Sequence, residues 1–164
     1  MAAGATYEPI ATQTLASTAT SVSFTSIAAT YTDLVFVAQY STNTGTGIYF
    51  RINNDSATNY SDTALSGNGT TASSSRDTSV NKMSIGTGYS TATTTTIMNI
   101  QNYANTTTNK TVLWRNNTSG NFAEAFVGLW RSTSAINRID ISPNFGANTF
   151  SVGSTFTLYG IASA

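Results

Sequence analysis

Residues 34–40 (LVFVAQY) and residues 48–52 (IYFRI) decide the fold class, and the turn-forming residues 43–47 (NTGTG) separate them. The first run is short, apolar and rich in β-branched and aromatic residues, which favours a central strand. In the second run, isoleucine and phenylalanine alternate with Tyr49 and Arg51, which is the two-residue period of a half-buried strand. The two runs therefore predict two β-strands joined by a polar turn.

The same pattern continues along the rest of the chain. Further strands are predicted at residues 22–24, 83–85, 97–103, 111–115, 122–131, 139–142 and 155–161. Residues 121–130 also place Phe122, Phe126 and Trp130 at helical spacing, but the β-rich neighbours on both sides favour a strand. About ten strands separated by turn signals are typical of a sandwich or a jelly roll.

We therefore expect an all-β protein, an antiparallel β-sandwich that is jelly-roll-like and has about ten strands. Residues 10–164 are predicted to form one sandwich domain, and residues 1–9 an N-terminal arm. Residues 70–75 (TTASSS) are of low complexity and are predicted to form a surface loop. The predicted inward residues are Phe24, Leu34, Phe36, Ile48, Phe50, Ile52, Ile85, Val127, Leu129, Ile139, Ile141, Phe156 and Leu158.

The composition is unusual in its charge. Charged residues make up 9% of the 164 residues, and seven basic residues balance seven acidic ones. Nucleic acid is not an expected partner, because phosphate binding needs a basic field. No apolar run approaches the ~20 residues of a membrane helix, so no membrane contact is expected either. A free protein usually keeps its net charge away from zero, so a neutral chain is expected to work within an assembly.

The sequence offers few residues that protect the edges of a β-sheet. Lysine, proline and bulges normally keep open edges from pairing with other chains, yet the chain contains two lysines and two prolines. We therefore expect contacts within an oligomer to cover the edges. A homotrimer is predicted, because closed symmetry hides edges without open-ended growth.

Catalytic chemistry has few residues to use. The chain has no histidine and no cysteine, which removes Ser-His and Cys-His nucleophiles and the preferred ligands of zinc. No spacing in the sequence pairs the seven carboxylates for glycoside hydrolysis. They are Glu8, Asp33, Asp55, Asp62, Asp77, Glu124 and Asp140. We therefore predict no catalytic residue, no metal and no cofactor, and the chain is not expected to be an enzyme.

Two binding alternatives stay open. Residues 55–62 (DSATNYSD) place several oxygen ligands in one segment, which suits calcium, although a polar turn capped by its own Asp and Asn side chains is favoured. Exposed aromatic rings would suit a sugar, and the candidates are Trp114, Trp130, Tyr60, Tyr89 and Tyr103. Such rings more often fill a core or an interface. Arg115 and Arg131 each follow a tryptophan directly, so they are predicted to point to the opposite face of their strands.

Six segments point to a particular family. They are residues 7–12 (YEPIAT), 31–36 (YTDLVF), 50–55 (FRINND), 59–61 (NYS), 65–69 (LSGNG) and 153–161 (GSTFTLYGI). In this order, over nearly the whole chain, they resemble a family of small virion proteins of tailed bacteriophages. The resemblance implies a β-sandwich module that decorates a capsid or forms part of a tail fibre or tip. It assigns no functional residue.

The leading hypothesis is a structural protein on the capsid surface of the virion. Such a decoration or cement protein stabilises the lattice of its partner, the major capsid protein. The sequence carries no coiled coil or shaft of the kind that usually precedes a fibre tip, which favours the capsid. The alternative is a phage tail-fibre or receptor-binding module that binds a host surface glycan. An interface is predicted at Tyr7, Glu8, Pro9 and Ile10.

Overall fold

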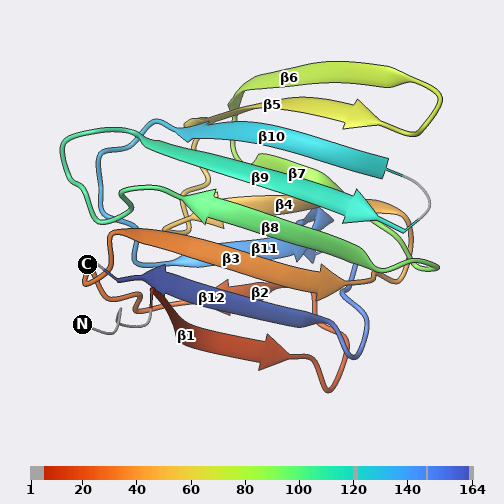
Figure 1. The fold of residues 1–164 in the computed structure, drawn as a ribbon, viewed down its shortest axis with the longest axis horizontal. Coiled ribbons are helices and arrows are strands. Elements are labelled where there is room, and N and C mark those ends of the chain that lie inside the picture. The colour runs from red at the N-terminus through yellow and green to blue at the C-terminus, as the bar shows by residue number, and fades with distance from the viewer. Residues whose placement is uncertain (1–5, 120–121, 147, 163–164) are drawn as a thin grey trace.

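The computed structural model describes residues 6–119, 122–146 and 148–162. Its strands form an eight-stranded sheet, in the order β1-β12-β3-β8-β9-β10-β5-β6, and a four-stranded sheet, in the order β2-β11-β4-β7, which lies behind the larger one in Figure 1. One short 3-10 helix, η1 (Asn144–Gly146), follows β11. The strands are β1 (Tyr7–Thr14), β2 (Val22–Phe24), β3 (Asp33–Tyr40), β4 (Thr46–Ile52), β5 (Tyr60–Gly67), β6 (Ala72–Val80), β7 (Met83–Gly88), β8 (Thr94–Ile100), β9 (Lys110–Thr118), β10 (Phe122–Trp130), β11 (Ile139–Pro143) and β12 (Thr155–Ile161).

The connectivity of the two sheets is that of a jelly roll. β1 pairs with β12, β2 with β11, β3 with β8, and β4 with β7, always antiparallel. Because these pairs are nested, the chain forms one long ribbon that is rolled up between two sheets. Two hairpins, β5–β6 and β9–β10, are inserted into this ribbon and extend the larger sheet beyond β8. The predicted antiparallel, jelly-roll-like sandwich is therefore confirmed, with twelve strands in the described residues.

The inner faces of the two sheets share one hydrophobic core, which contains side chains from both. Its centre is aromatic, with ring centroids 6.4 Å apart for Phe36 and Phe156 and 4.8 Å apart for Phe150 and Phe156. Such aromatic contacts add to the free energy gained by burying the rings. The predicted inward residues are buried, with the exceptions of Val127 and Leu129.

Strand β10 turns the opposite face to the core from the one predicted. Phe126 and Trp130 are buried, whereas Val127 is 44% exposed and Leu129 is half-buried on the outer side of the sheet. Both faces of β10 are apolar, so alternation alone does not fix its orientation. Phe126 stacks on Trp114 with ring centroids 5.0 Å apart. The larger aromatic side chains bury more apolar surface, and this places them inside.

The serine-rich segment after β5 is a strand from Ala72 onward, so the prediction of a surface loop at residues 70–75 is wrong for residues 72–75. β6 begins at Ala72, and the hairpin turn lies just before it. The side-chain oxygen of Asn68 accepts hydrogen bonds from the backbone N–H groups of Thr70 and Thr71, at 3.0 and 2.7 Å. This Asx-type turn reverses the chain, and pairing with β5 then satisfies the backbone of β6.

The outer edges of the larger sheet carry their own protection. Pro9 lies in edge strand β1, at a bulge where the register with β12 shifts. Edge strand β6 has Arg76 and Asp77 near its middle, and pairing it about a two-fold axis with a second β6 would set like charges opposite each other. Proline, charge and bulges are devices that block edge pairing. Oligomer contacts are therefore not required to cover these two edges. The homotrimer stays a prediction.

Candidate functional site

The outer face of the eight-stranded sheet carries two neighbouring rows of mostly apolar side chains. Opposite residues of an antiparallel pair point to the same face, so the register defines rows across the sheet. One row runs through Tyr159, Val35, Asn99, Leu113, Val127 and Thr63, and the next through Thr157, Val37, Ile97, Arg115, Ala125 and Leu65. The exposed fraction is 62% for Leu65, 45% for Leu113 and 44% for Val127. We refer to these two rows as the outer face.

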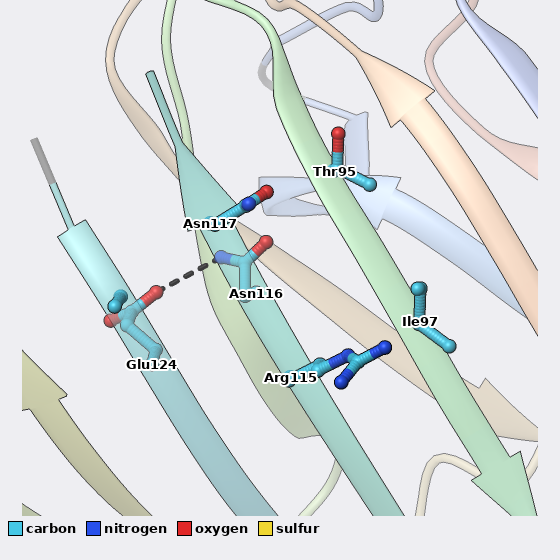
Figure 2. Close-up of a pocket in the computed structure, with 7 residues that line it drawn as sticks. Thr95, Ile97, Arg115, Asn116, Asn117 and Glu124 are labelled. Atoms are coloured by element: carbon cyan, nitrogen blue, oxygen red, sulfur yellow. Dashed lines mark hydrogen bonds between the residues drawn. The ribbon is translucent and has the colours of Figure 1, made fainter. Parts of the chain in front are cut away.

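A shallow groove follows the outer face across the middle of the sheet. Tyr7, Val35 and Leu113 line one hollow of about 340 Å³ and also a second of about 420 Å³. The second hollow continues to Ile97 and Arg115, which line a third of about 340 Å³ (Figure 2). Because neighbouring hollows share lining residues, they form one continuous outer groove. Its volume is in the range of ligand sites, but its shallow form suits an extended contact.

Arg115 is the charged side chain in the middle of these apolar rows. It lies opposite Ile97 of β8 and Ala125 of β10, and its guanidinium makes no hydrogen bond or ion pair with another described residue. The prediction that it points away from the core is confirmed, because Trp114 before it is buried and Arg115 is exposed. An arginine whose donors are unused among the described residues is suited to a carboxylate or a carbonyl on a partner.

A polar network adjoins this part of the groove, because Asn116 and Glu124 line the third hollow, and it continues from them to the buried residues Thr96 and Tyr40. The side-chain amide of Asn116 donates to Glu124 at 2.9 Å, as Figure 2 shows, and its oxygen accepts a bond from Thr96 at 2.9 Å. Thr96 also contacts the hydroxyl of Tyr40 at 3.2 Å, and burial raises the pKa of that phenol. Gly86 makes room for the network, since a Cβ there would lie 2.0 Å from Asn116 Nδ2. These bonds join β3, β8, β9 and β10 and so hold the groove's floor in shape.

The four predicted interface residues lie in the first strand. β1 begins at Tyr7, so residues 7–9 of the predicted arm belong to the sheet, and residues 1–5 lie outside the described residues. Tyr7 is 59% exposed and lines the outer groove, with its ring edge-on to Tyr159 at 6.3 Å. Glu8 and Pro9 are exposed, and Ile10 packs partly against the core. Tyr7 is therefore the member of this set that joins the outer face.

The calcium alternative at residues 55–62 has its two carboxylates in different places. Asp55 accepts hydrogen bonds from the Ala57 N–H, the Asn59 side chain and Trp130 Nε1, at 2.9, 2.9 and 2.7 Å. These donors outweigh the effect of burial and lower the pKa of Asp55. Asp62 lies in β5 and turns inward. The segment is a turn capped by its own side chains, and the described residues hold no cluster of three or more metal-binding side chains.

The structure pairs two carboxylates, those of Asp62 and Asp77, that the sequence did not indicate as a pair. The register of the β5–β6 hairpin sets Asp62 directly opposite Asp77, and Asp62 accepts a hydrogen bond from the Ser84 N–H at 3.2 Å. Burial raises the pKa of Asp62 to about 6, and the neighbouring charge of Asp77 adds to the shift. Neither residue lines the outer groove. The pair therefore makes the stability of the β5–β6 hairpin depend on pH. It does not face the outer groove, where a substrate could bind.

The aromatic candidates for sugar binding are mostly core residues. Trp114, Trp130, Tyr60 and Tyr103 are at most 3% exposed. Tyr89 is half-buried and stacks on Phe122, with ring centroids 6.4 Å apart. Arg131 is exposed on the opposite face from buried Trp130, as predicted, and its guanidinium donates to the Tyr60 carbonyl and the Ser61 hydroxyl, at 3.3 and 2.8 Å. The favoured interpretation of these rings as core therefore holds for four of the five.

No protein-family model matches the chain, and comparisons with curated proteins and with solved structures found no match either. The described residues include no helix that is long and apolar enough to cross a membrane. Fold and site together define a class of protein: a jelly-roll β-sandwich whose larger sheet exposes an apolar face with a single central arginine.

Proposed function

We propose that the protein is a structural component of a bacteriophage virion that decorates the capsid and binds the major capsid protein. The observation that carries this proposal is the exposed apolar outer face of a chain with zero net charge. A monomeric soluble protein rarely leaves a large contiguous apolar patch in water, so such a patch marks a contact surface. Zero net charge fits a protein that spends its working life assembled.

The fold and the sequence add independent support. Jelly rolls recur in capsid proteins and lectins, so this fold favours binding roles without selecting one. The resemblance of six segments to small virion proteins of tailed phages narrows the choice. Within this proposal the protein sits on the capsid surface, stabilises the lattice by spanning neighbouring capsid subunits, and acts without a cofactor.

Purified particles of the phage that encodes the chain test the proposal. Quantitative mass spectrometry is expected to find the protein at a copy number comparable with that of the major capsid protein. Particles that lack it are expected to lose their DNA at a lower temperature, because a ligand that binds the native lattice stabilises it. A copy number like that of tail proteins, with unchanged capsid stability, would overturn the proposal.

A tail-fibre or receptor-binding module is the second candidate. Thr95, Arg115 and Asn117 lie around the hollow shown in Figure 2, and hydroxyl, guanidinium and amide groups are suited to sugar hydroxyls. A glycan array probed with the isolated protein separates the two candidates. Strong binding to a host surface glycan, together with location in the tail, would favour this module over the capsid protein.

A further inference from the structure

The outer face has the size of the core of a protein interface. The sheet face of the six strands from β12 to β5, with about seven residues in each strand, has a projected area of roughly 700 Å², and the two rows take up about half of it. Each partner in a standard protein interface contributes about 800 Å². Leu113 and Val127 are the exposed side chains nearest its middle, and Leu65 lies at its β5 end. A patch of this size within a larger sheet face matches the apolar core of such an interface.

Arg115 decides what kind of partner fits. It lies between Ile97 and Ala125, and no described residue pairs with its guanidinium. A partner that covers the outer face removes this charge from water, and an unpaired buried charge is costly. The two carboxylates that line the groove, Asp33 and Glu124, already accept hydrogen bonds, from the Asn102 N–H at 2.6 Å and from the Asn116 side-chain amide at 2.9 Å. The compensating anion must therefore come from the partner.

A second copy of this chain does not meet that requirement. Two copies that join by the same face are related by a two-fold axis, which sets equivalent surfaces against each other. An axis through the middle of the outer face brings the two Arg115 side chains together and supplies no free carboxylate. Charge complementarity therefore favours a different protein, since matched potentials across an interface select the partner.

We infer that the outer face of the eight-stranded sheet is the attachment surface, and that its partner is a protein surface with apolar side chains around an Asp or Glu that pairs with Arg115. This inference rests on the proposed function for the identity of that partner, the major capsid protein. Arginine in an apolar surround is a frequent hot spot of protein interfaces. The Asn116–Glu124 bond beside the groove keeps β9 and β10 in the register that presents Arg115.

Co-sedimentation with shells assembled from the major capsid protein tests the inference through two matched pairs of variants. Leu65→Asp changes the outer face, and Val152→Asp changes a side chain of nearly equal exposure, 62% against 61%, in the turn before β12. Arg115→Glu reverses the central charge, and Lys82→Glu reverses a charge between β6 and β7, where Lys82 lies over the ring of Tyr49 in the four-stranded sheet. Circular dichroism and melting curves check that each variant folds.

Wild type, Val152→Asp and Lys82→Glu are expected to bind the shells equally well. Leu65→Asp and Arg115→Glu are expected to weaken binding by about tenfold or more, with partial recovery in Arg115→Lys. Folded Leu65→Asp and Arg115→Glu that bind like wild type would overturn the inference and leave the proposed function standing. Wild type that does not bind the shells would overturn the proposed function, and with it the partner named here.

Two further outcomes would assign a different binding partner to the outer face. Light scattering in which wild type is an oligomer and Leu65→Asp a monomer, with shell binding retained, would assign the outer face to a second copy. Glycan binding that Arg115→Glu abolishes, again with shell binding retained, would assign it to a sugar. Either result overturns attachment through this face.

Discussion

Strands β9 and β10 present two apolar faces that differ in the shape of their side chains. On the inner face Trp114 and Phe126 stack 5.0 Å apart and are 3% and 7% exposed. On the outer face the cross-strand pair Leu113 and Val127 has 45% and 44% of its surface exposed. Large flat rings fill a closed space between two sheets, whereas smaller aliphatic groups form an open surface. An apolar residue in a strand can therefore fill the core or form an exposed contact surface. In β9 and β10 the side chains with the larger volume are the ones in the core.

The largest expected effect comes from removing the inner stack. Trp114→Ala should lower the free energy of unfolding by about 3–5 kcal/mol, because it leaves a cavity beside Phe126 and Met83. Urea denaturation followed by tryptophan fluorescence of Trp130 and by circular dichroism measures the change. A loss below about 1 kcal/mol would contradict the assignment of this face to the core.

A smaller effect is expected from adding volume to the same face. A Cβ at Gly128 would lie 2.3 Å from Met83 Sδ and 2.7 Å from the Trp114 ring. Gly128→Ala should therefore cost about 1–3 kcal/mol through overpacking. Gly45→Ala is the matched control, because a Cβ there meets no atom within 4 Å. Equal melting temperatures for the two variants would contradict the tight packing of β10 on β7.

The sequence predicts the fold well and the site poorly, and β9 and β10 explain both results. Strand formation depends on local patterns, so residues 34–40 and 48–52 were enough to indicate an all-β sandwich. Residues 112–114 (VLW) are apolar at consecutive positions, which signals a strand with two apolar faces. The two apolar faces of β9 could therefore be predicted. Which face is buried depends on the strands that pack against β9, and most of these lie far away in the sequence. The pairing of Asp62 with Asp77 was hidden for the same reason, because register is a tertiary property.

Protonation of Asp62 should change stability by a further, smaller amount. Its pKa of about 6 in the folded protein exceeds the ordinary value of ~3.9, so the folded state holds the proton more tightly. The contribution of Asp62 to stability should therefore be greatest below pH 4, fall as the pH rises to about 6, and stay level above that. Asp62→Asn removes this loss and should stabilise the protein by about 1–2 kcal/mol at pH 8 but not at pH 4. Chemical denaturation of the variant and of the wild type at the two pH values measures it. An equal effect at both pH values would contradict the shift.

The smallest expected effect concerns the outer face itself. Leu113→Thr and Val127→Thr place a β-branched residue in the strand and remove apolar surface that already contacts water. The free energy of unfolding of the isolated protein should change by no more than about 0.5 kcal/mol. The same two variants should weaken attachment to the shell, because there the lost apolar surface is buried. Substitutions on the outer face are thus expected to weaken attachment with little change in the free energy of unfolding. Trp114→Ala, in contrast, is expected to lower both. A loss of 2 kcal/mol or more in the isolated protein, growing with protein concentration, would mean that copies of the chain already cover this face in solution.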